Sequence, residues 1–169
     1  MELLIPGLIL VALMVWASTK IKKTAADAFQ EEHIETDAYA LRKPEGFLHV
    51  IGDDNHELMA YSREYGKGDN TGVRQATIEL DILHDSSVEN AIESIRQSAV
   101  STELTSRSET EAELNTEEAA NESTVSAVYR IVARRDSVYR LRFAVLAEHK
   151  DEYLRRIDET FESFTIKHA

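Results

Sequence analysis

The sequence opens on a long apolar run, which limits what the N-terminal part of the chain can fold into. Residues 3–17 carry no charged side chain, and lysines close the run at positions 20, 22 and 23. A helix rises about 1.5 Å per residue, so roughly 20 residues cross the ~30 Å hydrocarbon layer of a bilayer. Residues 1–23 are therefore predicted to form a transmembrane anchor with a basic flank. The side chains expected to hold it in the bilayer are Leu3, Leu8, Leu13, Trp16, Lys20, Lys22 and Lys23.

A cleaved signal peptide is the alternative interpretation of this run. A signal peptide begins with a basic region, whereas this chain has Glu2 and no lysine or arginine before the apolar residues. We therefore favour a permanent single-pass anchor in a bacterial inner membrane. The positive-inside rule places the lysines in the cytoplasm and the N-terminus outside. The soluble domain is accordingly expected in the cytoplasm, with the periplasmic or lumenal side as the alternative.

The remainder of the chain is acidic and long enough for one domain with its own core. The 169 residues include 31 acidic and 19 basic side chains, a formal net charge of −12. Nucleic acid and anionic lipid surfaces repel such a domain, so both are discounted as its partners. The chain has no cysteine, which excludes disulfides, thiolate metal sites and thiol catalysis. We expect a polar stalk at 24–36 and one globular domain at 37–169.

The pattern of apolar residues predicts the elements of this domain. Apolar and polar residues alternate most clearly over 75–83, as in a half-buried strand. Ser86 and Glu89 have the spacing of a capping box and predict a helix over 86–100. The other expected elements are strands at 39–42, 47–51, 56–65, 108–114, 123–135 and 138–147, an acidic loop after 114, and a final helix that begins near His149.

The strands of this list are joined by turns rather than by helical crossovers. This order favours an α+β fold, in which helices flank an antiparallel sheet. In the strand over 138–147, Leu141 and Phe143 are expected to face the core, while Arg140 and Arg142 face outward.

Four short motifs of the domain are similar to those of a known family. They are YALRKPEGF at 39–47, with its proline–glycine turn, SVE at 87–89, YRLRF at 139–143 and FESF at 161–164. On these motifs the chain resembles the PsbP/Mog1-like superfamily, over about residues 37–166. The resemblance implies an α/β/α sandwich and a mostly non-catalytic role, as in accessory subunits of photosynthetic complexes, nuclear-transport factors and bacterial envelope proteins. The motifs are structural, so the resemblance implies no functional residue.

The sequence contains no pattern typical of a catalytic or metal site. None of the six histidines forms an HExxH motif or a comparable close pair of ligands. His49 and His56 flank a turn at 52–55, for which a solvated turn is a better interpretation than a cation site. Neither a G-x-S-x-G motif nor a P-loop is present. Glu79 and Asp81 share a strand face that a solvated outer surface explains. We therefore expect no enzyme activity, no catalytic residue, no cofactor and no metal.

Four arginines are the candidate residues for docking a partner: Arg130, Arg134, Arg140 and Arg142. If the strands over 123–135 and 138–147 pair, several of these arginines line one outer sheet face. A basic stripe on an acidic domain is suited to bind a partner protein. The alternative is that the arginines form ion pairs with the many glutamates nearby.

Together these features predict a non-catalytic accessory or assembly subunit of a larger membrane protein complex, which docks by its anchor helix and its soluble domain. Its expected partners are subunits of that complex and, through the anchor, the lipid bilayer. Tethering raises the effective concentration of the domain near its partner, so a weak contact suffices. The alternative is a membrane-tethered module that binds a small ligand or a metal ion in a pocket between sheet and helix.

Overall fold

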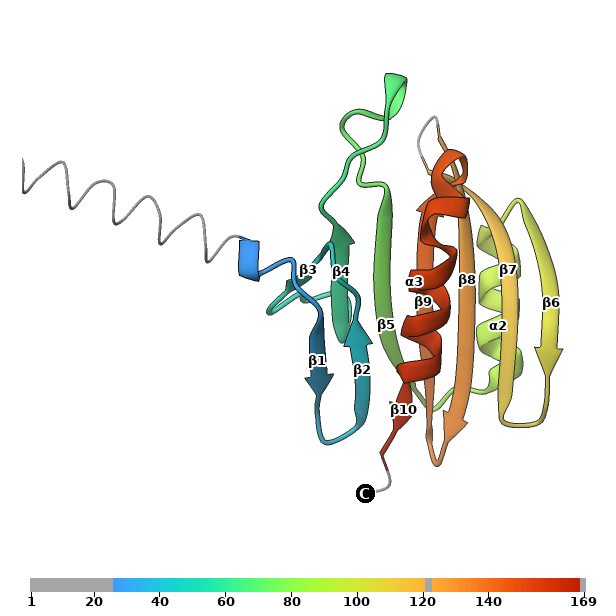
Figure 1. Ribbon diagram of the computed structural model, residues 1–169. Helices are drawn as coiled ribbons and strands as arrows, with labels where there is room; N and C mark the ends of the chain where they lie inside the picture. Colours follow the sequence, from blue (N-terminus) through green and yellow to red (C-terminus); the bar gives the residue numbers. More distant parts are fainter. Residues whose placement is uncertain (1–25, 121–122, 168–169) are drawn as a thin grey trace, which may run out of the picture.

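The computed structural model describes residues 26–120 and 123–167, which form two antiparallel sheets and two α-helices (Figure 1). This arrangement confirms the predicted α+β class. The anchor predicted at 1–23 lies outside the described residues. Within the described ranges, no helix combines the length and the apolar character needed to cross a membrane.

The larger sheet has seven strands. In spatial order they are β3 (Phe47–Val50), β4 (Leu58–Ser62), β5 (Ala76–His84), β9 (Ser137–Leu146), β8 (Ser123–Arg134), β7 (Glu111–Ala120) and β6 (Ser101–Arg107). Hairpins join β3 to β4, β6 to β7, β7 to β8 and β8 to β9, whereas β5 and β9 pair across a long stretch of chain. Ile78 of β5 lies opposite Phe143, and Leu80 lies opposite Leu141.

The smaller sheet consists of β1 (Glu32–Glu35), β2 (Tyr39–Lys43) and β10 (Thr165–Ile166), in the order β1-β2-β10. β1 falls in the segment for which the sequence predicted a stalk. It pairs with β2 instead, and its Ile34 is buried in the domain core. A lone apolar residue among charged neighbours gave no periodic signal, which explains why this strand was missed.

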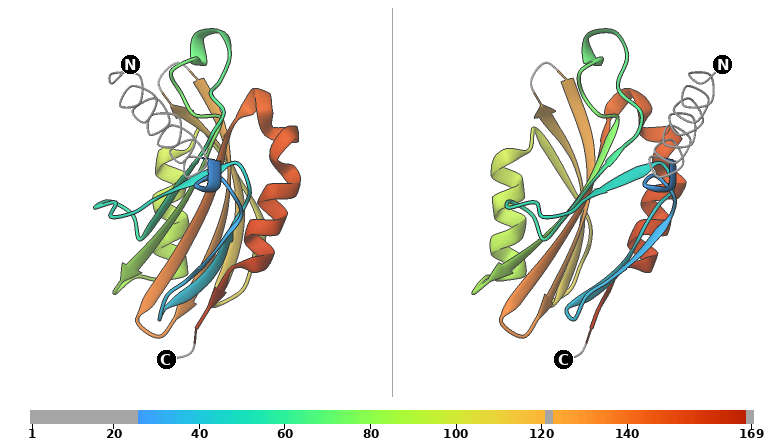
Figure 2. Two further views of the ribbon diagram at one scale, coloured as in Figure 1. Left: turned by 60° about the vertical axis from the view of Figure 1, so that its left-hand side comes forward. Right: turned by 90° about the vertical axis from the view of Figure 1, so that its left-hand side faces the viewer.

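The two helices cover opposite faces of the larger sheet (Figure 2). α2 (Val88–Ser98) packs on β7, β8 and β9, while α3 (Lys150–Ser163) and the smaller sheet lie on the other face. Two short 3₁₀ turns, η1 (Gly68–Asn70) and η2 (Ala147–His149), precede β5 and α3.

The N-cap of α2 is Ser87, so the predicted capping box at Ser86 was wrong by one residue. The Ser87 hydroxyl oxygen accepts a hydrogen bond from the backbone N–H of Asn90 at 3.1 Å. Glu89, the expected second half of the box, instead forms an ion pair with Arg107 of β6.

Each face of the sheet has its own apolar core. On the α3 side, Phe47, Phe143 and Tyr153 pack edge to face or tilted, with ring centroids 5.5–6.4 Å apart. They fill the space between α3 and the sheet. On the α2 side, Ile92 and Ile95 of the helix are buried against strand residues, which include Ala112, Leu114, Ala127, Ile131 and Ala144.

Within residues 101–120 the sequence predicted one strand followed by an acidic loop, and the structure differs. It forms the long hairpin of β6 and β7. The inward residues of β7 are Ala112, Leu114 and Thr116, while β6 is exposed over most of its length. Small or polar inward residues weaken the alternation from which a strand is predicted.

Candidate functional site

The α2-side face of the larger sheet is only partly covered by its helix. α2 lies over β7, β8 and β9, whereas on the same face β3 and β4 present half-buried apolar side chains. Residues opposite one another in antiparallel strands share a face, so the pairing register defines this surface. We call it the open half-face; its residues are Leu48, Val50, Met59, Tyr61, Thr77, Glu79 and Asp81.

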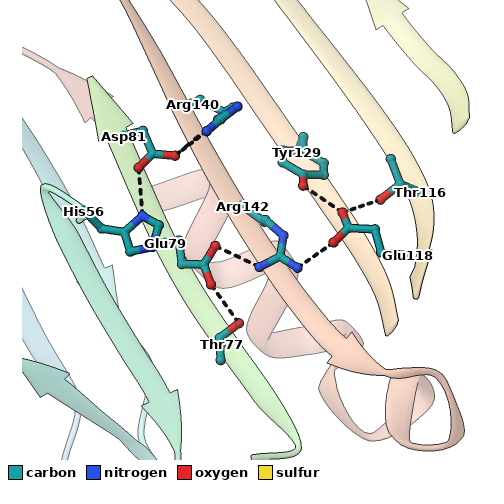
Figure 3. Close-up of polar contacts among 9 residues, drawn as sticks. All are labelled: His56, Thr77, Glu79, Asp81, Thr116, Glu118, Tyr129, Arg140 and Arg142. Carbon is teal, nitrogen blue, oxygen red and sulfur yellow. Dashed lines mark hydrogen bonds and ion pairs between the residues drawn. The ribbon is translucent and has the colours of Figure 1, made fainter. Parts of the chain in front are cut away.

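A row of ion pairs begins at Glu79 of the open half-face and continues across β9 to Glu118 of β7 (Figure 3). Arg142 of β9 is its centre: one guanidinium nitrogen lies 2.8 Å from Glu79 of β5, and another lies 2.6 Å from Glu118 of β7. Tyr129 of β8 donates its hydroxyl to Glu118 at 2.7 Å, and Thr116 donates to it at 3.0 Å. One arginine thus connects strands on both of its sides.

Burial and pairing act in opposite directions on these groups. Burial raises the pKa of Glu118, but hydrogen bonds from Arg142 and Tyr129, together with the charge of Arg142, outweigh it and hold that pKa below its ordinary value. For Arg142 the directions are reversed: burial lowers its pKa, while Glu79 and Glu118 raise it, and the net effect is an increase. The pair is therefore charged in the folded protein.

A second polar chain ties the β3–β4 loop to β5. The guanidinium of Arg140 donates to one oxygen of Asp81 at 2.8 and 3.2 Å, and Nδ1 of His56 lies 2.8 Å from the other oxygen. His56 belongs to the loop that precedes β4, whereas Asp81 belongs to β5 (Figure 3). This contact fixes the loop against the sheet.

An acidic hollow of about 500 Å³ lies beside this chain. Its lining includes Asp53, Asp54, Glu57 and Asp81, with Arg140 as a positive charge. Asp53 accepts hydrogen bonds from the backbone N–H groups of residues 55 and 56 at 2.9 and 2.8 Å, which lower the pKa of its carboxyl. The hollow is therefore negatively charged at neutral pH.

A cationic stack lies at the other end of β4. The guanidinium of Arg74 is 4.4 Å from the ring centroid of Tyr61 and 4.0 Å from that of Tyr65. It also donates to the backbone carbonyls of Ser62 and Arg63. Cation–π contact and two hydrogen bonds hold this arginine in place beside the open half-face.

The carboxylates of the row of ion pairs and of the second polar chain already accept hydrogen bonds. Glu79, Asp81 and Glu118 each accept a charge-assisted hydrogen bond from an arginine. The lowered pKa of Glu118 makes its carboxylate a weak base. The arrangement is suited to keep a surface rigid rather than to transfer protons.

The histidines and acidic residues do not gather into a metal centre within the described residues, where no group of three or more potential ligands is found. His49 lies 3.7 Å from Glu32 of β1, whereas His56 contacts Asp81. The turn between these two histidines therefore does not bring them together.

The structure divides the four predicted docking arginines between the two faces of the sheet. In the β8–β9 register Arg130 lies opposite Leu141, so it shares the α3-side face with that core residue. There Arg130 donates to the carbonyl oxygen of Phe161 at 2.8 Å. Arg134 follows at the end of the same strand, whereas Arg140 and Arg142 lie on the α2-side face. They therefore form no single basic stripe.

Ion pairing was the alternative interpretation of these arginines, and three of them do form ion pairs. Arg130 lies 3.9 Å from Glu111, and Arg140 and Arg142 form the pairs described above. The expectation of a solvated surface at Glu79 and Asp81 was wrong, since their side chains are 16% and 15% exposed. The sequence analysis did not single out Glu118 and Tyr129. Along β7 and β8 their side chains lie on the same strand faces as apolar residues.

No model of a known protein family matches the chain, and no curated protein sequence matches it. Its structure is similar to that of the Ran-binding protein Mog1p of Saccharomyces cerevisiae, with 14% identity, 82% of this chain and 96% of Mog1p covered, and a TM-score of 0.55. LpqN of Mycobacterium tuberculosis gives 11% identity, 82% and 91% coverage, and a TM-score of 0.55. These likenesses show that the chain has a Mog1-like α+β fold.

Proposed function

We propose that this protein is a membrane-tethered, non-catalytic accessory or assembly subunit that docks a partner protein on the open half-face. The observation that carries the proposal is the half-covered sheet face. Leu48, Val50, Met59 and Tyr61 form an apolar group there that stays half-buried within the domain itself. Contiguous apolar surface with a polar rim is typical of protein interaction sites.

The surroundings of the apolar group support the same role. The ion pairs of Arg140 and Arg142 make the adjoining sheet a rigid polar rim. Tyr61, Tyr65 and Arg74 are residue types that dominate binding energy at protein interfaces. Of the structural neighbours, Mog1p is a Ran-binding protein and LpqN is involved in cell envelope biogenesis. The description of Mog1p favours a binding role for the present chain over a catalytic one.

The tether in this proposal is the apolar run at 3–17, followed by its three lysines. It confines the domain to the inner membrane, with the domain on the cytoplasmic side. Confinement converts docking into an almost intramolecular step and raises the effective concentration of the domain. A modest interface therefore suffices to keep the subunit on its complex.

A pull-down of the tagged full-length protein in mild detergent, followed by mass spectrometry, tests the proposal. The expected result is recovery of the subunits of one membrane complex in constant proportion. A chain that begins at Ala26 is the matched control, because it keeps the open half-face and lacks the predicted anchor. Recovery of the full-length protein as a partnerless monomer would contradict the proposal.

A second candidate function is the binding of a small anionic ligand. A hollow of about 620 Å³ on the α3 side is lined by Arg134, Arg135, Tyr139 and Lys167, together with two aspartates. Its volume lies in the range of ligand sites. A thermal-shift screen of small carboxylates and phosphates tests this function, and stabilisation at micromolar concentration would favour it over docking alone.

A further inference from the structure

We infer that the partner segment which occupies the open half-face is an amphipathic helix, laid beside α2, with a lysine or arginine at the end that lies over the acidic hollow. This inference rests on the proposed function and specifies the chemistry of its partner. Three independent features of the surface carry it: its dimensions, its apolar pattern and its charge distribution.

The dimensions match one helix. Adjacent strands lie about 4.8 Å apart and a helix is about 10 Å wide, so one helix covers roughly two strands. β3 and β4 have four and five residues, and strands of these lengths extend about 14 Å and about 17 Å. A helix of about 9 to 11 residues spans the same distances. α2, which covers the neighbouring part of this face, also has 11 residues.

The apolar pattern is that of a helix-binding surface. Leu48 lies opposite Tyr61, and Val50 lies opposite Met59, which gives a block of four apolar side chains on two strands. Ile51, the residue that follows β3, is 90% exposed. A helix with apolar residues at positions i, i+3 or i+4, and i+7 presents a matching stripe. An extended segment would instead pair with the β3 edge and leave the face uncovered.

The charges at the two ends of this block have opposite signs. Asp53, Asp54 and Glu57 line the hollow at one end, where Asp81 is already neutralised by Arg140. Arg74 is held between two tyrosines at the other end. A helix dipole is positive at its N-terminus and negative at its C-terminus. The partner helix therefore lies with its N-terminal end, and its basic residue, over the hollow and its C-terminal end toward Arg74.

Site-specific crosslinking in the full-length, membrane-bound protein locates the occupant. A benzophenone side chain is introduced in place of Met59, and, as a control, in place of Leu154, which is 47% exposed on α3. The expected product from position 59 joins the domain to an amphipathic helix of the partner that carries lysine or arginine at one end. A product with a second copy of this chain, with its own residues 1–25, or with an extended partner segment would overturn the inference.

Charge reversal tests the orientation. The double variant Asp54→Lys/Glu57→Lys should reduce recovery of the partner by about tenfold at low salt. Glu103→Lys/Glu117→Lys makes the same change of charge on exposed positions of β6 and β7 and should leave recovery unchanged. Thermal unfolding confirms that both variants are folded. Equal recovery by all three proteins would overturn the inference but leave the proposed function intact, whereas failure of the wild type to recover any partner would overturn both.

Discussion

Nζ of Lys43 lies 2.6 Å from the backbone carbonyl oxygen of Phe47, at a position where the lysine side chain is only 1% exposed. The same nitrogen donates to the carbonyls of Ala28 and Gln30, at 3.2 and 2.6 Å. An ammonium group has three donors, and three carbonyls accept them here. Burial lowers the pKa of Lys43, and the charge of nearby Glu32 partly offsets this effect. Lys43 therefore fastens the segment before β1 to the β2–β3 turn.

Replacement of Lys43 by methionine should lower the free energy of unfolding by about 2–4 kcal/mol, because it leaves carbonyl groups without their donor in a buried place. Urea denaturation measures the change. Lys67→Met, at an exposed position, is the matched control and should change the stability by less than about 0.5 kcal/mol. Equal stability of the two variants would mean that the three hydrogen bonds contribute nothing to folding.

Arg142→Leu should destabilise the domain by about 2–3 kcal/mol, because Glu79 and Glu118 then lose their common cation while they remain mostly buried. Chemical denaturation measures this loss. Arg155→Leu provides the control, since its side chain is 85% exposed and its ion pair with Glu159 lies on the helix surface. If Arg142→Leu were as stable as the control, the row of ion pairs around Arg142 would not stabilise the fold.

The lowered pKa of Glu118 predicts a dependence of stability on pH. Its ordinary value is 4.5, and the folded state holds it lower. As pH falls, the unfolded chain therefore binds the proton first, so this group stabilises the fold above pH 4.5 and its contribution is lost as pH falls through the folded pKa. Glu118→Gln should flatten the decline of unfolding free energy over this acidic range. Glu117→Gln, on the same strand and exposed, controls for the loss of one carboxylate. An unchanged acid slope in Glu118→Gln would contradict this assignment.

The sequence predicted those elements whose local chemistry agrees with the final fold. Ile78 and Leu80 of β5, and Leu141 and Phe143 of β9, alternate with polar residues and are buried as expected. The turn before β3 was also predicted; its Gly46 has a φ of 90°, which favours glycine. Prediction of strands from alternating apolar residues fails where the inward residues are polar. β7 presents Thr116 and β1 has only Ile34, so neither resembled a buried strand.

The site was harder to predict because it depends on registers between strands that are distant in the sequence. Arg142 meets Glu79 and Glu118 through pairings with β5 and across β8, which no local pattern specifies. Whether Arg130 lies on the same sheet face as Arg140 or on the opposite face depends on the strand register, because a shift by one residue moves every side chain of the strand to the other face. The sequence singled out the arginines, but it did not predict how they are divided between the two faces of the sheet.

The role of β1 provides a last test, because the sequence predicted a stalk where the structure forms a strand. A chain that begins at Asp37 loses β1, the buried side chain of Ile34, and two of the carbonyls that Lys43 binds. Burial of one isoleucine contributes about 1.5–3 kcal/mol, so this chain should unfold at least about 2 kcal/mol more easily than one that begins at Ala26. Ile34→Ala in the longer chain isolates the packing contribution and should give part of the same loss. Equal stability of the two truncated chains would show that the segment behaves as a linker in solution, whereas the expected difference would make it part of the folded domain.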